Sequence, residues 1–158
     1  MVNPDRNAGI TGPRVFRYVV RYDCGTAPNP YGGVCTLAIC KPKIRKAAQV
    51  GDWVIGFQRQ HTGWVTYAME VTERLTFAEY WNDPRFESRK PGNAFPDNLY
   101  EPVGRRMVRV PNDVHGPLDK KKDLSGRHVL VSDRFWYFGR DAVRLPEALW
   151  HLVHKTQG

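Results

Sequence analysis

Long apolar runs and cysteines are scarce in this sequence. No segment approaches the roughly 20 apolar residues of a membrane-spanning helix, and only three cysteines occur in 158 residues. The opening residues, MVNPDRNAGITGPR, have neither the apolar core nor the cleavage pattern of a secretory signal. An odd number of cysteines without an export signal indicates free thiols in a reducing compartment. We therefore expect a cytoplasmic protein without a membrane segment.

Motifs for cofactors and metals are also absent. The sequence contains neither G-x-G-x-x-G nor a P-loop, so it does not predict a dinucleotide or NTP site of those types. Cys24, Cys35 and Cys40 match no zinc-binding pattern, and the five histidines are scattered along the chain. The deaminase signature, H-x-E followed by P-C-x-x-C, is missing as well. We expect no metal ion and no cofactor.

Positive charge is what the sequence has in excess. Lys and Arg number 24 against 16 Asp and Glu, which gives a formal net charge of +8. Such an excess favours an anionic partner, with nucleic acid first, a nucleotide second and an acidic membrane surface third. A basic soluble protein without such a partner would show the same excess, so charge alone leaves both alternatives open.

Short strands and short helices are predicted along most of the chain. β-Branched and aromatic residues predict strands at 15–22, 52–58, 63–73, 128–132 and 135–139, and the stretch 34–40 is apolar enough to be buried. Apolar periodicity and end signals predict helices at 41–50, 76–82 and 145–154. Thr76 and Glu79 form the T-x-x-E capping box of the second helix, and Asp83-Pro84 ends it. This order predicts an α+β domain around a strongly bent sheet or small mixed β-barrel with short flanking helices.

The chain is expected to form one domain. We predict a flexible N-terminus at 1–14 and a single domain over 15–158, because no internal repeat or second boundary is visible. Residues 87–127 form a long insertion with five prolines, four glycines and only brief strand candidates near RMVRV. Loops of this length inside a compact domain are usually functional or disordered.

Several motifs resemble a known family when they are taken in order. They are RYDCGTAPNPYGGVCTLAICKPKIRKAAQVGDWVIG, VTYAMEVTE, TFAEYWNDPRF and HVLVSDRFWYFG. Over about residues 15–140 the chain resembles the second family of nucleotide-modification-associated domains, which was proposed from genomic context in phages and bacteria. The resemblance implies a role in nucleotide or DNA modification, with partner proteins of a modification system. More distantly, the order of elements is similar to the PUA-type group, which includes EVE, ASCH and YTH domains. In those small bent β-barrels a base or nucleotide binds in a pocket beside the barrel.

Four cations precede Gly51 in a short predicted helix; they are Lys41, Lys43, Arg45 and Lys46. In PUA-type relatives this segment helps to approach nucleic acid, so the resemblance implies that the four contact phosphates of DNA, of a nucleotide or of RNA. Lys41 and Lys43 lie at the helix start, where the helix dipole disfavours cations unless an anion is bound. A solvated helix face is the alternative.

A base would need a polar edge and a flat wall. Asn29, in the rigid Pro-Asn-Pro segment, could present its amide to a base edge or satisfy its own turn. Trp53 or Trp136 is expected as the stacking wall. In FWYFG, alternation leaves two choices for the inward pair: Phe135 with Tyr137, or Trp136 with Phe138.

Asp23, Cys40 and Asp133 are the catalytic candidates. Cys40 precedes a helix start, a position that favours a thiolate, although a buried core cysteine is the alternative. Asp133 could act as a base or form a turn, and Asp23 could pair with Arg21. No recognised set of nucleophile, base and oxyanion donors is visible, so the sequence names no reaction. We rank a binding module first, an enzyme acting on a nucleotide or DNA base second, and a protein–protein adaptor third.

Overall fold

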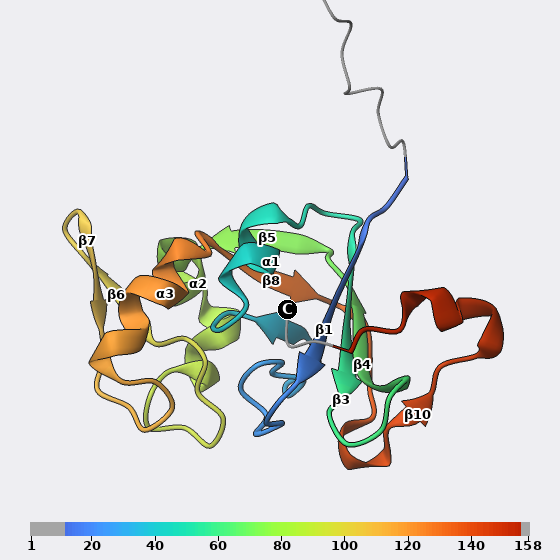
Figure 1. Cartoon of the computed structure of the whole chain (residues 1–158). Coiled ribbons are helices and arrows are strands. Elements are labelled where there is room, and N and C mark those ends of the chain that lie inside the picture. Colours follow the sequence, from blue (N-terminus) through green and yellow to red (C-terminus); the bar gives the residue numbers. More distant parts are fainter. Residues whose placement is uncertain (1–11, 156–158) are drawn as a thin grey trace, which may run out of the picture.

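The structure is a computed structural model that describes residues 12–155 of the chain (Figure 1). The expected flexible N-terminus spans 1–14, of which residues 1–11 lie outside the described part. The described chain is anchored from Arg14 onward, because the backbone amide of Arg14 donates to Asp52 Oδ1 (2.9 Å) and its guanidinium donates to Oδ2 (2.6 Å). The described residues form a mixed α+β domain of ten strands and a few short helices. The predicted α+β class is therefore confirmed.

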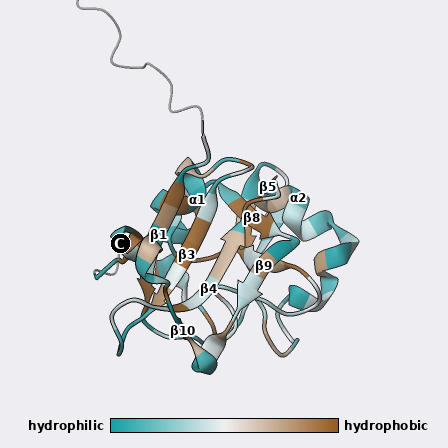
Figure 2. Cartoon of the chain, turned by 90° about the vertical axis from the view of Figure 1, so that its right-hand side faces the viewer, coloured by the Kyte–Doolittle hydropathy of each residue, from teal (hydrophilic) through white to brown (hydrophobic). Residues whose placement is uncertain are grey.

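The largest sheet is built around two central antiparallel strands, β3 (Trp53–Gln58) and β4 (Trp64–Glu70). Strand β1 (Val15–Val20) runs parallel to β3. Strands β9 (Arg134–Tyr137) and β10 (Val143–Arg144) share the other edge of β4, both antiparallel to it (Figure 2). The predicted strands at 15–22 and 52–58 are thus confirmed within two residues at each end.

A second sheet packs against the first, and the chain continues from one sheet into the other at a corner. Its order is β2-β8-β5, formed by β2 (Cys35–Leu37), β8 (His128–Ser132) and β5 (Glu73–Thr76). The chain passes from β4 into β5 and from β8 into β9, so two bent strands run through both sheets. The corner is pinned where the amide of Asp133 donates to Thr72 Oγ1 (3.1 Å). A strongly bent sheet is therefore present, but neither sheet closes into a barrel within residues 12–155, and the expected PUA/EVE-like barrel is not confirmed.

The main core lies between the two sheets. It joins side chains of the first sheet to side chains of the second, namely Tyr18, Val54, Tyr67 and Met69 with Cys35, Leu37 and Leu130. The hydroxyls of Tyr18 and Tyr67 bond to each other at 2.8 Å, so neither polar group is left unsatisfied in the core. Gly56 makes this pairing possible, because a Cβ there would lie 2.4 Å from the Tyr67 ring.

Residues 12–155 contain three α-helices, each six residues long: α1 (Pro42–Ala47), α2 (Phe77–Asn82) and α3 (Lys120–Ser125). The predicted capping box of α2 is confirmed, since Thr76 Oγ1 accepts from the Glu79 amide (3.2 Å) and Glu79 Oε2 accepts from the Thr76 amide (2.7 Å). Helix α1 is shorter than the predicted 41–50. The predicted C-terminal helix is instead a 3-10 helix over Glu147–Leu152.

The insertion at 87–127 is more structured than its composition suggested. It contains the hairpin of β6 (Tyr100–Val103) and β7 (Arg106–Arg109), a 3-10 turn at Pro117–Asp119, and α3. Leu99 and Tyr100 are buried against α2 and β8 in a second apolar cluster. In Figure 1 this segment lies on the side of the molecule away from β3 and β4. The insertion is therefore an integral layer of the domain.

Residues 23–33, which contain two prolines and three glycines, form a loop that contacts the insertion. Gly25, Gly32 and Gly33 adopt positive φ angles of 77–87°, which glycine tolerates. The buried guanidinium of Arg89 donates to the carbonyl of Tyr31 and, at 2.7 Å, to that of Val34. This loop therefore has a fixed position beside the end of β1.

Candidate functional site

An open cleft of about 770 Å³ lies where the end of β1, the start of α1 and the segment before α3 meet. This volume is within the range of ligand-binding sites in proteins. Lys41 and Lys43 line one wall, so two of the cations that precede Gly51 border a concavity. The opposite side of the cleft comes from the insertion, through residues 114–122.

The cleft is electropositive. Arg21, Lys41, Lys43 and Lys122 line it, and among the described residues on its walls Asp119 is the single carboxylate. The Lys41 ammonium lies 4.5 Å from the centroid of the Tyr18 ring. Burial lowers the pKa of Lys41, and the charge of Lys122 adds to this effect. Cations that converge in this way attract an anion, because a bound phosphate relieves their mutual repulsion.

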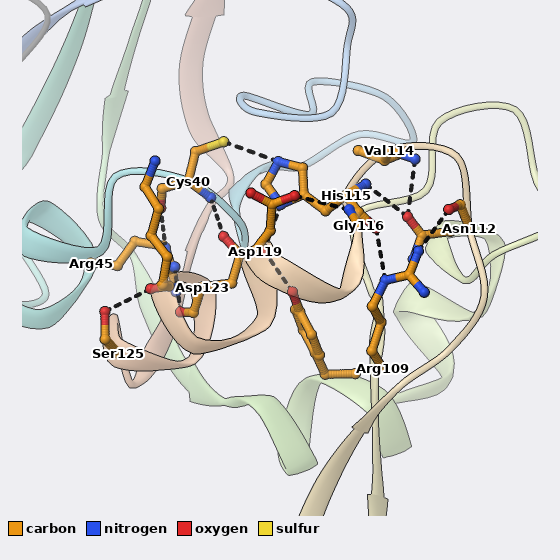
Figure 3. Close-up of polar contacts among 12 residues, drawn as sticks. Cys40, Arg45, Arg109, Asn112, Val114, His115, Gly116, Asp119, Asp123 and Ser125 are labelled. Atoms are coloured by element: carbon orange, nitrogen blue, oxygen red, sulfur yellow. Dashed lines mark hydrogen bonds and ion pairs between the residues drawn. The ribbon is translucent and has the colours of Figure 1, made fainter.

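A thiol, an imidazole and a carboxylate stand in a hydrogen-bonded chain on the cleft wall (Figure 3). Cys40 Sγ lies 3.4 Å from His115 Nε2, and His115 Nδ1 lies 2.6 Å from Asp123 Oδ2. Cys40 and His115 line the cleft, whereas Asp123 is fully buried behind them. Asp123 also accepts from the Tyr100 hydroxyl (2.6 Å) and, through Oδ1, from the amide of Cys40 (3.0 Å).

Electrostatics favour a charged pair at His115 and Asp123. The hydrogen bond to Asp123 raises the pKa of His115 to about 10, with a smaller contribution from Cys40. Burial raises the pKa of Asp123, but its hydrogen bonds with His115 and Tyr100 outweigh burial and hold that pKa below its ordinary value. At neutral pH the sulfur of Cys40 therefore faces an imidazolium whose far side is held by a carboxylate.

The loop that carries His115 is held by polar side chains of the same segment. Asn112 Oδ1 accepts from the amides of Val114 (3.0 Å) and His115 (2.9 Å). Arg109 donates to the carbonyls of Asn112 (2.8 Å) and His115 (2.7 Å), as Figure 3 shows. The imidazole thus sits on a braced turn.

The backbone at the thiol is unusual. Cys40 and Lys41 have φ angles of 58° and 38°, in the left-handed region that non-glycine residues rarely adopt. Arg45 stabilises this conformation from below, because its Nε donates to the Cys40 carbonyl at 2.6 Å. Its other two nitrogens donate to the carbonyls of Asp123 (2.6 Å) and His128 (2.9 Å).

Arg45 therefore has a different position from the one expected. We expected it at a phosphate or on a solvated helix face, but Arg45 is 0% exposed and its guanidinium donates to backbone carbonyls. Gly126 leaves room for it, since a Cβ there would lie 2.5 Å from the guanidinium. We do not include Arg45 in the phosphate-binding set. Lys46 is exposed on α1 but is not among the residues that line the cleft.

The expected base-binding residues lie away from the cleft. Asn29 is buried, and its amide donates to the Phe95 carbonyl (2.9 Å). Trp53 and Trp136 stack on each other, with ring centroids 5.9 Å apart and planes 18° from parallel. Trp53 adjoins Val54, which points into the main core, so the tryptophan pair occupies the outer face of the large sheet.

The FWYFG segment and the remaining carboxylates can also be placed. Phe135 and Tyr137 pack against the main core, whereas Trp136 is 52% exposed, so the first of the two alternatives holds. Asp23 accepts from the Tyr137 hydroxyl (2.8 Å) beside a smaller hollow of about 400 Å³. Asp133 is exposed at the turn between the sheets. Of the three catalytic candidates, the structure brings only Cys40 to the large cleft.

Sequence reasoning missed His115 and Asp123. They lie 75 and 83 residues from Cys40 in the chain, and no motif spacing links them. The only available signal was the length of the insertion, which indicates either function or disorder. Arg21, Tyr22 and Lys122 were missed as cleft residues for the same reason: only the fold brings them beside α1.

The fold and the site together define a small α+β domain with a cationic cleft and a thiol–imidazole–carboxylate chain on its wall. The chain belongs to the nucleotide modification associated domain 2 family, whose model matches residues 12–158. Membership of this family associates the protein with nucleotide or DNA modification. No curated protein and no solved structure matches the chain.

Within 12–155, no helix combines the length and the apolar character needed to cross a membrane. In that part of the chain, no three or more His, Cys, Asp or Glu residues are grouped in a way that could hold a metal ion.

Proposed function

We propose that this domain binds a nucleotide, free or within DNA, in the cationic cleft as part of a nucleotide-modification process. The observation that carries the proposal is the convergence of Arg21, Lys41, Lys43 and Lys122 on one cleft with a single opposing carboxylate. Membership of a nucleotide-modification family supports a nucleotide as the anion. A cleft of about 770 Å³ also favours a small-molecule or nucleotide site over a protein–protein adaptor.

The exposed cations at the rim of the cleft are the side chains that would bind the phosphate. Lys43, Lys122 and Arg21 are exposed at the cleft, where they can reach a phosphate oxygen without being desolvated first. Lys41 lies deeper, over the Tyr18 ring. Burial disfavours the charged form of Lys41 and lowers its pKa, so a bound anion would stabilise the ammonium.

Tyr22 is the residue that we assign to base stacking, in place of Trp53 or Trp136. It lines the cleft and is 72% exposed, and the guanidinium carbon of Arg21 lies 5.7 Å from the centroid of its ring. Proteins that bind single-stranded nucleic acid use exposed aromatic rings to stack on bases and nearby cations to hold the phosphate backbone. Tyr22 and its neighbouring cations offer the same two features. The base would therefore stack on Tyr22 while its phosphate contacts the lysines.

Binding measured at two salt concentrations tests this proposal. Labelled single- and double-stranded DNA, a matched RNA and deoxynucleotides would be titrated at 50 mM and 200 mM salt. We expect DNA affinity to fall several-fold between the two conditions, since phosphate contacts release counterions. No affinity in either condition, or an affinity unchanged by salt, would contradict the proposal.

Two pairs of variants locate the binding surface. Lys43→Ala and Lys122→Ala remove cleft cations, whereas Lys46→Ala and Lys121→Ala remove exposed cations from the same two helices outside the cleft. All four change the net charge equally. We expect the first pair to weaken binding about 3- to 10-fold each and the second pair to have little effect. Equal losses in both pairs would mean that binding follows net charge and not the cleft.

A further inference from the structure

We propose that Cys40 is a nucleophile that acts on a pyrimidine base in the cleft, with His115 as its proton partner and Asp123 as the residue that positions His115. The identity of the substrate rests on the proposed function, because the nucleotide is the ligand assigned to the same cleft. The nucleophile itself rests on separate observations of the three side chains.

The order of the three groups is that of an activated thiol. A nucleophile, a base within hydrogen-bonding reach and a third group that orients the base form the usual arrangement for covalent catalysis. Here Sγ, Nε2 and Nδ1 are linked in that order, with separations of 3.4 Å and 2.6 Å. The imidazole nitrogen that faces the thiol is therefore fixed by the carboxylate on the other side of the ring.

Asp123 holds both ends of the arrangement. One carboxylate oxygen accepts from His115 and the other accepts from the amide of Cys40. The phenol of Tyr100 fills a further acceptor position at 2.6 Å. The carboxylate is fully buried and held by these partners, so it fixes the positions of the thiol and the imidazole relative to each other.

The other two cysteines show what is particular to Cys40. Cys35 is fully buried in the main core, where burial raises the pKa of its thiol. Cys24 lines the same cleft as Cys40, but its thiol contacts the hydroxyl of Thr26 at 3.1 Å. Only Cys40 combines access to the cleft, an imidazole partner and a left-handed backbone. Strained backbone of this kind gathers at functional sites.

The chemistry that fits these groups is reversible conjugate addition to a pyrimidine. The C5–C6 double bond of a pyrimidine is conjugated to the polar group at C4, so C6 accepts a soft nucleophile. The step begins from a Cys40 thiolate facing the His115 imidazolium. The thiolate supplies the electron pair of a new S–C6 bond, the π pair moves to C5, and C5 takes the proton that the imidazolium donates. His115 then removes a proton from C5, and the S–C6 bond breaks to return the thiolate. Nothing is oxidised or reduced, and the net result without a second substrate is hydrogen exchange at C5.

Alkylation with iodoacetamide tests the nucleophile in the wild-type protein. Cys24 is an internal control, since it shares the cleft and its cations but lacks the imidazole. Peptide mass spectrometry would give the rate of each thiol from pH 5 to pH 9. We expect Cys40 to react at least 10-fold faster than Cys24 at pH 6, and His115→Gln to remove most of this difference. Equal rates for the two thiols in the wild-type protein would overturn the assignment, whatever the folding of the variant.

Hydrogen exchange tests the substrate. The protein would be incubated with dUMP, dCMP or a single-stranded DNA containing both bases in D₂O, and loss of the C5 proton signal would be followed by NMR. We expect exchange with at least one of the three, and no exchange above background with Cys40→Ser. Wild-type exchange no faster than that of the variant would overturn the pyrimidine assignment.

The outcomes separate this inference from the proposed function. Nucleotide binding by a protein whose Cys40 reacts like Cys24 overturns the inference and leaves the proposed function standing. A fast-reacting Cys40 in a protein that binds no nucleotide overturns the proposed function and the pyrimidine assignment, and leaves Cys40 as a nucleophile.

Discussion

His115 Nδ1 lies 2.6 Å from Asp123 Oδ2, which joins a loop at the cleft to a helix that supports it. The carboxylate is fully buried and the side chain of His115 is 17% exposed, so the pair has one face toward the cleft and one toward the interior. This relationship fixes the imidazole that faces Cys40. It also couples the charge state of the cleft to the stability of the fold.

The stability of the protein should decline on the alkaline side. The folded pKa of His115 is about 10 and its ordinary value is 6.5, so the folded state holds this proton more tightly than the unfolded state. The resulting stabilisation is complete below pH 6.5 and is lost as the pH rises to about 10. At about 1.4 kcal/mol per pKa unit it amounts to at most about 5 kcal/mol.

Urea denaturation at pH 6, 8 and 10 would measure this effect. We expect the unfolding free energy of the wild-type protein to fall across the series and that of His115→Gln to change much less. Parallel curves for the two proteins would show that the His115–Asp123 pair does not contribute in this way.

Arg45 should be among the most sensitive positions for stability. Arg45→Ala removes the guanidinium that donates to the carbonyls of Cys40, Asp123 and His128, at about 1–3 kcal/mol for each buried group left unsatisfied. The Asp123 carbonyl keeps a second donor, the amide of Gly126 (3.1 Å). We expect a loss of several kcal/mol in chemical denaturation. Lys46→Ala, the adjacent exposed position on the same helix, should stay within about 0.5 kcal/mol of the wild type. If the two variants are equally stable, the buried guanidinium is not what holds the start of α1.

Gly126→Ala tests the same contact from the other side. The new Cβ would lie 2.5 Å from the Arg45 guanidinium, while the backbone at Gly126 (φ −70°) accepts alanine without strain. A loss of stability can therefore come from displacement of Arg45 and not from the backbone. We expect the loss to shrink when Gly126→Ala is combined with Arg45→Ala, and additive losses in that double variant would count against the contact.

Tyr22 and Trp136 give opposite expectations for binding. Tyr22→Ala removes the exposed ring that lines the cleft, and we expect it to weaken nucleotide binding by about 1–3 kcal/mol. Trp136→Ala removes another exposed ring, this one on the outer face of the large sheet, and should leave binding unchanged. Fluorescence titration would distinguish them, and Tyr22→Phe should retain most of the affinity because its ring can still stack. The reverse pattern would place the base on the Trp53–Trp136 stack.

Local signals in the sequence predicted much of the fold. The capping box at Thr76 and Glu79, and the strand at 128–132, are where the pattern placed them. Both depend on neighbours within a few residues, so the information is contained in the sequence itself. Helix α3 was missed because KKKDLS offers only Leu124 as an apolar residue and so shows no helical periodicity.

The site was only partly predictable, for a physical reason. Lys41 and Lys43 stand out as a cluster of charge, and Cys40 as a thiol at a helix start. Arg45 belongs to the same cluster, but its burial also depends on the carbonyls of Asp123 and His128, which are distant in the chain and which no local pattern reports. The partner of Cys40 comes from a Pro- and Gly-rich insertion whose path only tertiary contacts determine.

Backbone NMR of the labelled protein titrated with dUMP tests the central claim most directly, because each backbone amide gives its own signal and the shifted signals locate the binding site. We predict that the largest shift changes occur at the cleft, at Tyr22, Lys43 and His115, and that the outer-face residues Trp53 and Trp136 barely move. Shift changes centred on the tryptophan pair, or none at all at millimolar dUMP, would contradict the claim that this cleft is the nucleotide site.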